Sequence, residues 1–211
     1  MTPTGSASAI RLIHIMPETA ASLEQMLAAL KALARDDVLG GTGPEQVAKP
    51  VDSWNPTHCG DAGLEILRNG AWRHEGTPIT RESLVKLFAT ILRKDADGET
   101  YLVTPAEKVR VRVEDAPFLA IRADRDGADQ NQTLVFTTNV GDVVAADAAH
   151  PIRVSIDRAT GEPRPYVLVR GRLEARILRA PFLELAEWAV EHEGRTGVWS
   201  GGAFFPIDAP P

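Results

Sequence analysis

Residues 69–118 are NGAWRHEGTPITRESLVKLFATILRKDADGETYLVTPAEKVRVRVEDAPF, and this stretch carries most of the information about the fold. Turn residues and charges recur in it between short apolar runs, and no single motif in it is a known cofactor loop. Five segments make up the pattern: NGAW (69–72), EGTPITR (75–81), LRKDADG (92–98), YLVTP (101–105) and VEDAPF (113–118). Their density indicates a binding surface built on closely spaced turns.

A β-hairpin and a helix are predicted at the start of this stretch. Residues 64–67 and 71–74 are short strand-like runs, and Asn69-Gly70 between them is typical of a tight hairpin turn. Thr80 is a potential cap for a helix over residues 81–93, whose apolar residues recur at helical spacing. The segment 95–98, which ends in glycine, should stop this helix.

After Gly98 the apolar period changes to two residues, which is typical of strands. The predicted elements are strands at residues 101–103, 109–113, 118–123, 133–138, 152–156 and 166–175, then a helix over residues 181–192. Strands at this spacing, separated by Gly- and Asp-containing turns, are typical of a small antiparallel barrel or sandwich. The sequence therefore predicts an α+β fold in which a hairpin–helix unit packs on an antiparallel barrel closed by a C-terminal helix.

Three segments are predicted along the chain. Residues 1–50 would hold a leader, an amphipathic helix over residues 18–34 and a Gly/Pro-rich linker; residues 51–98 the hairpin–helix domain; and residues 99–211 the barrel domain. Weak internal sequence similarity suggests a duplication. A hairpin with Gly76, followed by Arg81 and a helix, resembles a hairpin with Gly171, followed by Arg176 and a helix.

Composition narrows the class of protein. With 29 acidic and 23 basic side chains the net charge is −6, which repels phosphate polymers and argues against general nucleic-acid binding. Cys59 is the single cysteine, so no internal disulfide can form, and we expect a cytoplasmic location with no export signal. No apolar run reaches the roughly 18 residues of a membrane helix. We also expect neither a cofactor nor a metal site.

A candidate anion site lies at the predicted start of the helix at residues 81–93. Thr77, Thr80 and Arg81 bring hydroxyl and guanidinium groups to a helix N-terminus, where unpaired backbone N–H groups favour a phosphate. The alternative is that Thr80 only caps the helix while Arg81 pairs with a nearby carboxylate.

A second cationic cluster surrounds the later hairpin. Arg170 and Arg172 share one strand face by alternation, and Arg176 and Arg179 follow toward the last helix, so these guanidinium groups could hold a phosphate or carboxylate. The alternative is a solvated strand face whose arginines pair with glutamates such as Glu174.

Four other residues carry weaker signals. Asp115 or Glu114 could act as a general base or accept a hydrogen bond from a ribose hydroxyl, although an Asp before a Pro-containing bend more often stabilises a turn. Trp72 could stack on a base if one ring face is open, whereas buried tryptophans normally anchor a core. Cys59 is expected to be structural, with redox sensing as the alternative.

The same segments resemble the bacterial family described as domain of unknown function 1285, from about residue 54 to residue 207. The matching sequence motifs are Cys59-Gly60-Asp61, the Trp72 strand, Gly76-Thr77-Pro78-Ile79 with Arg81, Leu84-Val85, Leu87-Phe88, Lys94-Asp95, Leu102-Val103-Thr104-Pro105, Glu107-Lys108 and Glu114-Asp115-Ala116-Pro117-Phe118. The resemblance implies a two-part fold with internal duplication and a C-terminal half like a pleckstrin-homology barrel. It also implies a site between the parts for a nucleotide-like molecule in signalling, and it transfers no catalytic residue.

These observations predict a cytoplasmic protein that binds a small anionic or nucleotide-like ligand in a cleft between two parts. Arg81 and the helix start would hold the anion; Arg170, Arg172, Arg176 or Lys108 would neutralise it; Trp72 would stack; and Asp115 would accept from a hydroxyl. Two alternatives remain. One is a hydrolase that uses Asp115 or Glu114 as base, and the other is an interaction module in which a partner peptide, or the chain's own helix at residues 18–34, lies across a groove.

Overall fold

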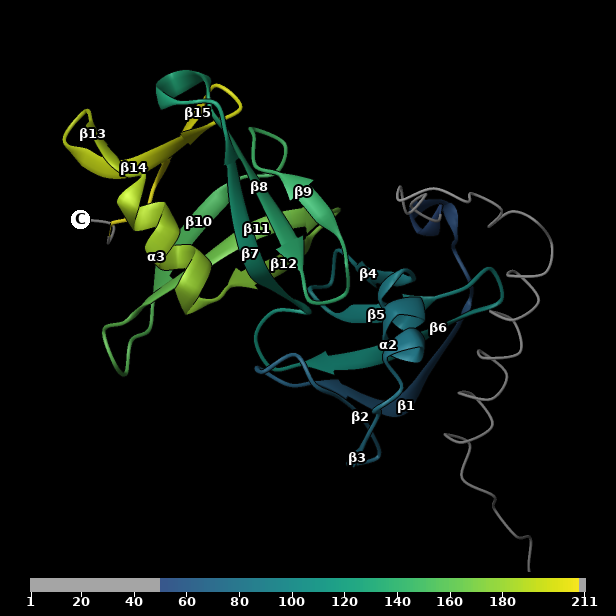
Figure 1. The fold of residues 1–211 in the computed structure, drawn as a ribbon. Helices are drawn as coiled ribbons and strands as arrows, with labels where there is room; N and C mark the ends of the chain where they lie inside the picture. The colour runs from purple at the N-terminus through teal and green to yellow at the C-terminus, as the bar shows by residue number, and fades with distance from the viewer. Residues whose placement is uncertain (1–49, 209–211) are drawn as a thin grey trace, which may run out of the picture.

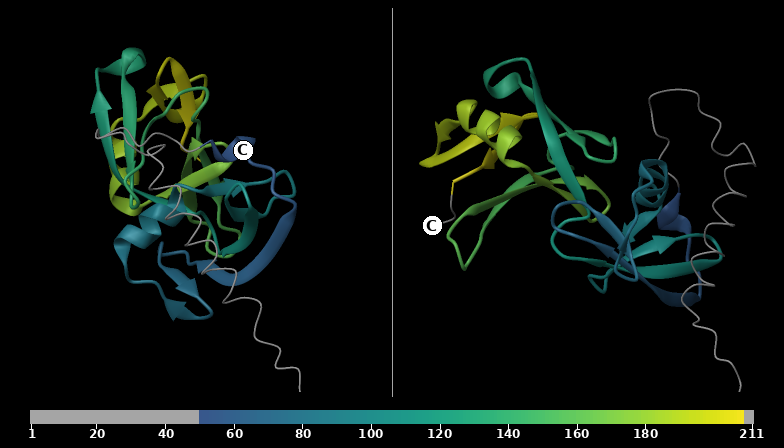
Figure 2. Two further views of the ribbon diagram at one scale, coloured as in Figure 1. Left: turned by 90° about the vertical axis from the view of Figure 1, so that its right-hand side faces the viewer. Right: turned by 60° about the horizontal axis from the view of Figure 1, so that its bottom comes forward.

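A computed structural model describes residues 50–208 of the 211-residue chain. The amphipathic helix predicted at residues 18–34 lies outside the described residues. Within them the fold is mostly β, with two α-helices, and it forms two lobes that each contain a six-stranded sheet (Figures 1 and 2). This mostly β fold with two helices is compatible with the α+β prediction.

The first lobe is built on a sheet with the strand order β3-β2-β1-β6-β5-β4. Its elements are η1 (Val51–Ser53), β1 (His58–Ile66), β2 (Trp72–His74), β3 (Thr77–Pro78), α2 (Glu82–Ala89), β4 (Leu92–Lys94), β5 (Thr100–Val103) and β6 (Glu107–Val113). β6 shows why these residues form a strand on the core: Val109 and Val111 are buried while Arg110 and Arg112 alternate outward. β1 pairs with β6 in parallel, and the other neighbours are antiparallel.

The predicted hairpin at Asn69-Gly70 is present but its loop is longer than two residues. The Leu67 N–H donates to the Ala71 carbonyl, and the Asn69 side chain accepts from the Ala71 N–H. Gly70 has φ of 80°, in the left-handed region that glycine adopts at least cost.

The predicted helix over residues 81–93 is shorter than expected, because α2 ends at Ala89 and β4 starts at Leu92. The cause is packing: Ile91 and Leu92 are both buried and cannot remain on one helix face. α2 lies against the first sheet, with Phe88 next to Trp72 at a ring-centroid distance of 6.0 Å (Figure 1). Apolar periodicity alone could not separate the helix from the buried strand that follows it.

The second lobe has the strand order β10-β11-β12-β7-β8-β9. Its elements are β7 (Phe118–Asp126), η2 (Asp129–Asn131), β8 (Thr133–Thr138), β9 (Val143–Ala145), β10 (Ile152–Ile156), β11 (Pro163–Arg170), β12 (Leu173–Ile177) and α3 (Arg179–Glu187). The run predicted as one strand at residues 166–175 is a hairpin that turns at Gly171. β12 and β7 pair in parallel, so the sheet is not the purely antiparallel barrel that was predicted.

The predicted terminal helix over residues 181–192 is present as α3 but ends earlier, and a third, three-stranded sheet follows it at the end of the described chain. α3 ends at Glu187, and β13 (Val190–His192), β14 (Arg195–Ser200) and β15 (Ala203–Pro206) follow. His192 packs against Trp199 and Phe204 at ring-centroid distances of 4.9 Å each. These cross-strand contacts hold the three half-buried rings together, and they favour a strand where the predicted helix would have continued to His192.

The two large sheets repeat one topology. In each, a three-strand meander is followed by a second meander, and the first strand of one pairs in parallel with the last strand of the other, as β1 does with β6 and β7 with β12. The helices break the repeat, since α2 lies between the meanders and α3 follows both. The hairpins at Gly76 and Gly171, which the sequence predicts to be equivalent, lie in the first meander of one sheet and in the second meander of the other. The repeat is therefore in the strand order of the sheets rather than in these two hairpins.

The sheets also place the division between the lobes. β5 and β6 belong to the first sheet, so the chain passes from one lobe to the other between Val113 and Phe118. The sequence predicts the boundary at residues 98 and 99, where the apolar period changes. Residues 98 and 99 lie in the turn between β4 and β5, inside the first lobe, rather than at a step between lobes.

Candidate functional site

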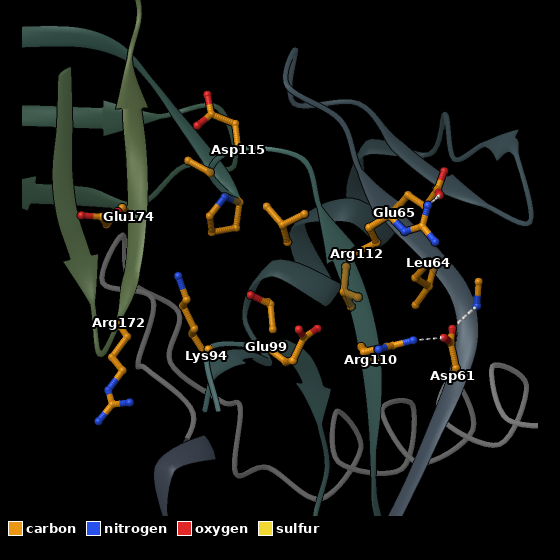
Figure 3. Close-up of a pocket in the computed structure, with 17 residues that line it drawn as sticks. Asp61, Leu64, Glu65, Lys94, Glu99, Arg110, Arg112, Asp115, Arg172 and Glu174 are labelled. Carbon is orange, nitrogen blue, oxygen red and sulfur yellow. Dashed lines mark hydrogen bonds and ion pairs between the residues drawn. The ribbon is translucent and has the colours of Figure 1, made fainter. Parts of the chain in front are cut away.

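A cavity of about 520 Å³ lies at the junction of the two lobes (Figure 3). Its walls come from β1, β6, the β4–β5 turn, the connection at residues 115–117 and the β11–β12 hairpin of the second lobe. Most of its lining side chains are charged, and we name it the charged cavity. Its size is within the roughly 300–1,000 Å³ of small-molecule sites.

β6 and β1 supply two ion pairs on one wall of the charged cavity. Arg110 contacts Asp61 at 3.0 Å, and Arg112 contacts Glu65 at 3.4 Å. These arginines face the cavity because the valines between them face the core, so the repeat VRVRV at residues 109–113 is the sequence signal for this wall. The signal was present in the sequence, but the site prediction did not use it.

A bulge in β1 positions the Asp61 carboxylate. The pairing of β1 with β6 shifts register between Asp61 and Leu64, and Gly63 in the bulge has φ of 60°. The Gly63 N–H donates to Asp61 Oδ1 at 2.9 Å. This backbone hydrogen bond, followed by the bond from Arg110, lowers the pKa of Asp61 below its ordinary value, so the wall keeps a fixed negative charge at neutral pH.

Two cations that line the charged cavity have no carboxylate partner among residues 50–208. These are Lys94, at the end of β4, and Arg172, at the tip of the β11–β12 hairpin. Arg172 Nη1 makes one long contact of 3.4 Å to the Asp95 carbonyl. Figure 3 shows Lys94 extending into the space between the two lobes, whereas the Arg172 guanidinium is turned away from Asp115. Lys94 therefore offers its charge to a ligand directly, whereas Arg172 would have to change rotamer to do so.

Asp115 lines the charged cavity, but the protein itself occupies both of its oxygens. Tyr166 donates its hydroxyl proton to Asp115 Oδ1 at 2.6 Å, and Arg176 contacts Oδ2 at 3.4 Å. Burial, followed by this hydrogen bond, raises the pKa of Tyr166 above its ordinary value. The predicted ligand-binding roles of Asp115 and Arg176 therefore give way to a contact that joins the interlobe connection to β11 and β12.

Lys108 is also engaged within the first lobe and does not line the charged cavity. Its ammonium lies 2.9 Å from Asp95 and 4.3 Å from the centroid of the Tyr101 ring. Arg93 contacts the same carboxylate at 2.6 Å and donates to the carbonyls of Val51 and Trp54. These contacts fix the position of η1 and of the β4–β5 turn.

The predicted anion site at the start of α2 is not part of the charged cavity. Thr77, Thr80 and Arg81 are exposed, and none of them lines the cavity. The N-cap residue is Arg81 rather than Thr80, and no side chain caps the helix there. The interpretation of Thr80 as the helix cap is therefore wrong, and the anion site at this helix start stays a prediction.

Arg170 lies at the opposite end of α2 from Arg81. Its guanidinium donates to the carbonyl of Ala89 at 2.6 Å and pairs with Asp142 at 2.7 Å. Eight helical residues separate the two ends of α2, which corresponds to about 12 Å. The predicted convergence of Arg81 and Arg170 on one ligand is therefore not present.

Trp72 is a core residue rather than a stacking platform. It is 1% exposed and lies beside Phe88 beneath α2. Cys59 is exposed and unpaired, and the described residues hold no group of three or more potential metal ligands. No helix in the described range is long and apolar enough to cross a membrane.

The fold and this cavity define a two-lobed, mostly β protein with a charged cavity at the lobe junction. Family models divide the chain at the same place as the two lobes. Residues 49–116 match "Domain of unknown function (DUF1285), N-terminal domain", and residues 117–207 match "Protein of unknown function (DUF1285), C-terminal domain". The chain belongs to the DUF1285 family, as the sequence resemblance predicts.

Two solved structures are similar to the chain. A DUF1285 family protein from Silicibacter pomeroyi DSS-3 is 46% identical, with a TM-score of 0.74 over 84% of this chain and 93% of that one. A DUF1285 family protein from Shewanella baltica OS155 is 29% identical, with a TM-score of 0.45 over 59% of this chain and 91% of that one. No curated protein matches significantly.

Proposed function

We propose that the protein binds a small anionic ligand in the charged cavity and does not turn it over. The observation that carries the proposal is the pair of Lys94 and Arg172, which approach one cavity from different lobes without a carboxylate partner in the described residues. A phosphate or carboxylate placed between them would gain charge-assisted hydrogen bonds from both lobes. Arg172 would reach it by a change of rotamer at the exposed hairpin tip.

The size and chemistry of the cavity favour a nucleotide-like molecule. A volume of about 520 Å³ fits a mononucleotide-sized ligand. Lys94 and Arg172 would hold its phosphate, while Glu99 on the same lining would accept hydrogen bonds from sugar hydroxyls. The proposal retains the expected cytoplasmic location and the signalling role that the family resemblance implies, and it does not depend on a pleckstrin-homology likeness of the second lobe.

A carboxylate-based hydrolase receives less support from the geometry. Asp115 accepts from Tyr166 and Arg176, and Glu114 Oε2 accepts from the Arg68 N–H at 2.8 Å. A general base needs an oxygen within hydrogen-bond reach of the proton that it removes, and these contacts engage three of the four candidate carboxylate oxygens. Assays of product formation on any ligand that binds would separate the two functions.

The test is a thermal-shift panel of nucleotides and cyclic dinucleotides on the full chain. A ligand that binds only the folded state raises Tm with its concentration and then saturates, since the stabilisation follows the ligand-to-Kd ratio. Lys94→Ala and Arg172→Ala should each weaken binding at least tenfold, while Arg81→Ala, at the far end of α2, should leave it unchanged. A panel without any shift, or an effect of Arg81→Ala alone, would reject this site.

A further inference from the structure

A second cavity, of about 550 Å³, lies on the other side of the β11–β12 hairpin tip and has a different character. Its floor and sides include Val51, Leu92, Val143, Val169 and Leu173, so we name it the apolar cavity. Lys94 and Arg172 line this cavity as well as the charged cavity, so the two cavities are neighbours.

Val143 is an apolar residue of this cavity whose side chain is exposed to solvent. It is 69% exposed, more than the other exposed large apolar residues of the described chain, which are Ile121, Leu183 and Val190. It lies on β9, an edge strand of the second sheet, and Leu92 across the cavity lies on β4, an edge strand of the first sheet. Exposed apolar edge strands are normally covered by another element, because uncovered ones pair with other chains.

The chain itself supplies a segment suited to cover this cavity. Residues 18–34 carry an apolar stripe of Leu23, Met26, Leu27, Leu30, Leu33 and Ala34 at helical spacing. The described chain begins at residue 50, and Val51 lies in the wall of the apolar cavity, so the preceding chain reaches the fold at the cavity itself. Residues 35–50 between the stripe and the cavity can span up to about 55 Å when extended, which gives ample reach.

Charge complementarity favours the same occupant. The apolar cavity is lined by Arg93, Lys94, Arg170 and Arg172 against Asp52 and Asp142. Residues 18–34 carry two acidic side chains, Glu18 and Glu24, and one basic side chain, Lys31, which gives the segment a net charge of −1. Opposite net charges would steer the segment to this face.

We propose that residues 18–34 fold back as a helix in the apolar cavity of the same chain and cover Val143. The apolar stripe would then lose its contact with water, which is the driving force for docking. Because Lys94 and Arg172 border both cavities, the docked helix would also lie beside the proposed ligand site. The docking itself depends only on the apolar cavity and is separate from the proposed function.

Disulfide trapping in the full chain tests the docking. In a Cys59→Ser background, Leu27→Cys and Val143→Cys are combined and treated with a mild thiol oxidant, and the products are mapped by mass spectrometry. The control pairs Leu27→Cys with Val190→Cys, an exposed position on β13 outside the cavity. We expect an intramolecular bridge at position 143 at least tenfold faster than at position 190. Equal rates, no bridge, or a covalent dimer would each overturn the proposal.

Hydrogen–deuterium exchange supplies a second measurement that needs no cysteine. Val143→Asp replaces an exposed side chain, so the fold should be retained, but a buried carboxylate would oppose docking. Amides of residues 23–34 should exchange at least tenfold faster in Val143→Asp than in the natural chain, and Val190→Asp should leave them unchanged. Exchange at the rate of an unprotected peptide in the natural chain would contradict the docked helix.

Discussion

The Arg170 guanidinium reaches across the lobe junction and donates a 2.6 Å hydrogen bond to the carbonyl of Ala89, the last residue of α2. The same side chain pairs with Asp142 at 2.7 Å and lies 4.9 Å from the centroid of the Phe118 ring. A cation at a helix C-terminus satisfies a carbonyl that has no partner inside the helix, and it also interacts favourably with the helix dipole. One arginine therefore stabilises the end of α2 and attaches it to the second sheet.

Arg170→Ala should lower the free energy of unfolding by about 2–3 kcal/mol, because it leaves the half-buried Asp142 carboxylate and the Ala89 carbonyl without their donor. Urea denaturation followed by circular dichroism measures the change. The matched control is Arg158→Ala, at an exposed site where the structure of residues 50–208 gives no ion pair. A loss equal to that of the control would mean that the junction contact does not stabilise the fold.

Tyr101 should resist ionisation until strongly alkaline pH. The hydrogen bond that it donates to Asp97 at 2.8 Å, with burial, raises the pKa of Tyr101 to about 12. Since an unfolded tyrosine has a pKa of about 10, its contribution to stability is complete below pH 10 and is lost as the pH rises toward 12. Asp97→Asn should bring the pKa down toward 10. Ultraviolet titration in a Tyr166→Phe background, which leaves one tyrosine, would detect the shift, and an unchanged midpoint would count against it.

Asp95 should contribute acid-sensitive stability. Burial raises the pKa of Asp95, but the hydrogen bonds from Arg93 and Lys108 outweigh it and bring the pKa below the ordinary value. The stabilisation is therefore present above about pH 4 and disappears as the pH falls through the lowered pKa. Asp95→Asn should cost roughly 1–3 kcal/mol at pH 7, and its difference from the natural protein should narrow at pH 3. Urea titrations at both pH values measure this, with the exposed Asp126→Asn as control; a gap that is constant with pH would contradict it.

Trp72 should be replaceable by phenylalanine but not by alanine. Trp72 Nε1 is buried and has no hydrogen-bond partner among residues 50–208, and the ring packs beside Phe88. Trp72→Phe removes an unsatisfied donor and opens a small cavity, so the net change should stay within about 1 kcal/mol. Trp72→Ala should cost about 3–5 kcal/mol. Chemical denaturation of both variants decides, and a Trp72→Phe loss as large as that of Trp72→Ala would reveal a hidden partner for the indole N–H.

The sequence alone predicted those features that local chemistry controls. Asn69-Gly70 marks a hairpin because few residues accept a positive φ, and the alternation of valine and arginine at residues 109–113 marks a strand with one face in the core. The family could also be recognised from short sequence motifs, without knowledge of the fold.

The tertiary structure alone decided which distant residues meet. Parallel pairing of β1 with β6 and of β7 with β12 joins strands far apart in the chain, and no local pattern encodes that choice. The packing of the two lobes places Arg170 at the C-terminal end of α2 rather than beside Arg81. The packing of α2 on the first sheet buries Trp72. The packing of the lobes also brings Lys94 and Arg172 to one cavity. Side-chain proximity across a junction depends on how two sheets pack, and periodicity within either sheet carries no information about that packing.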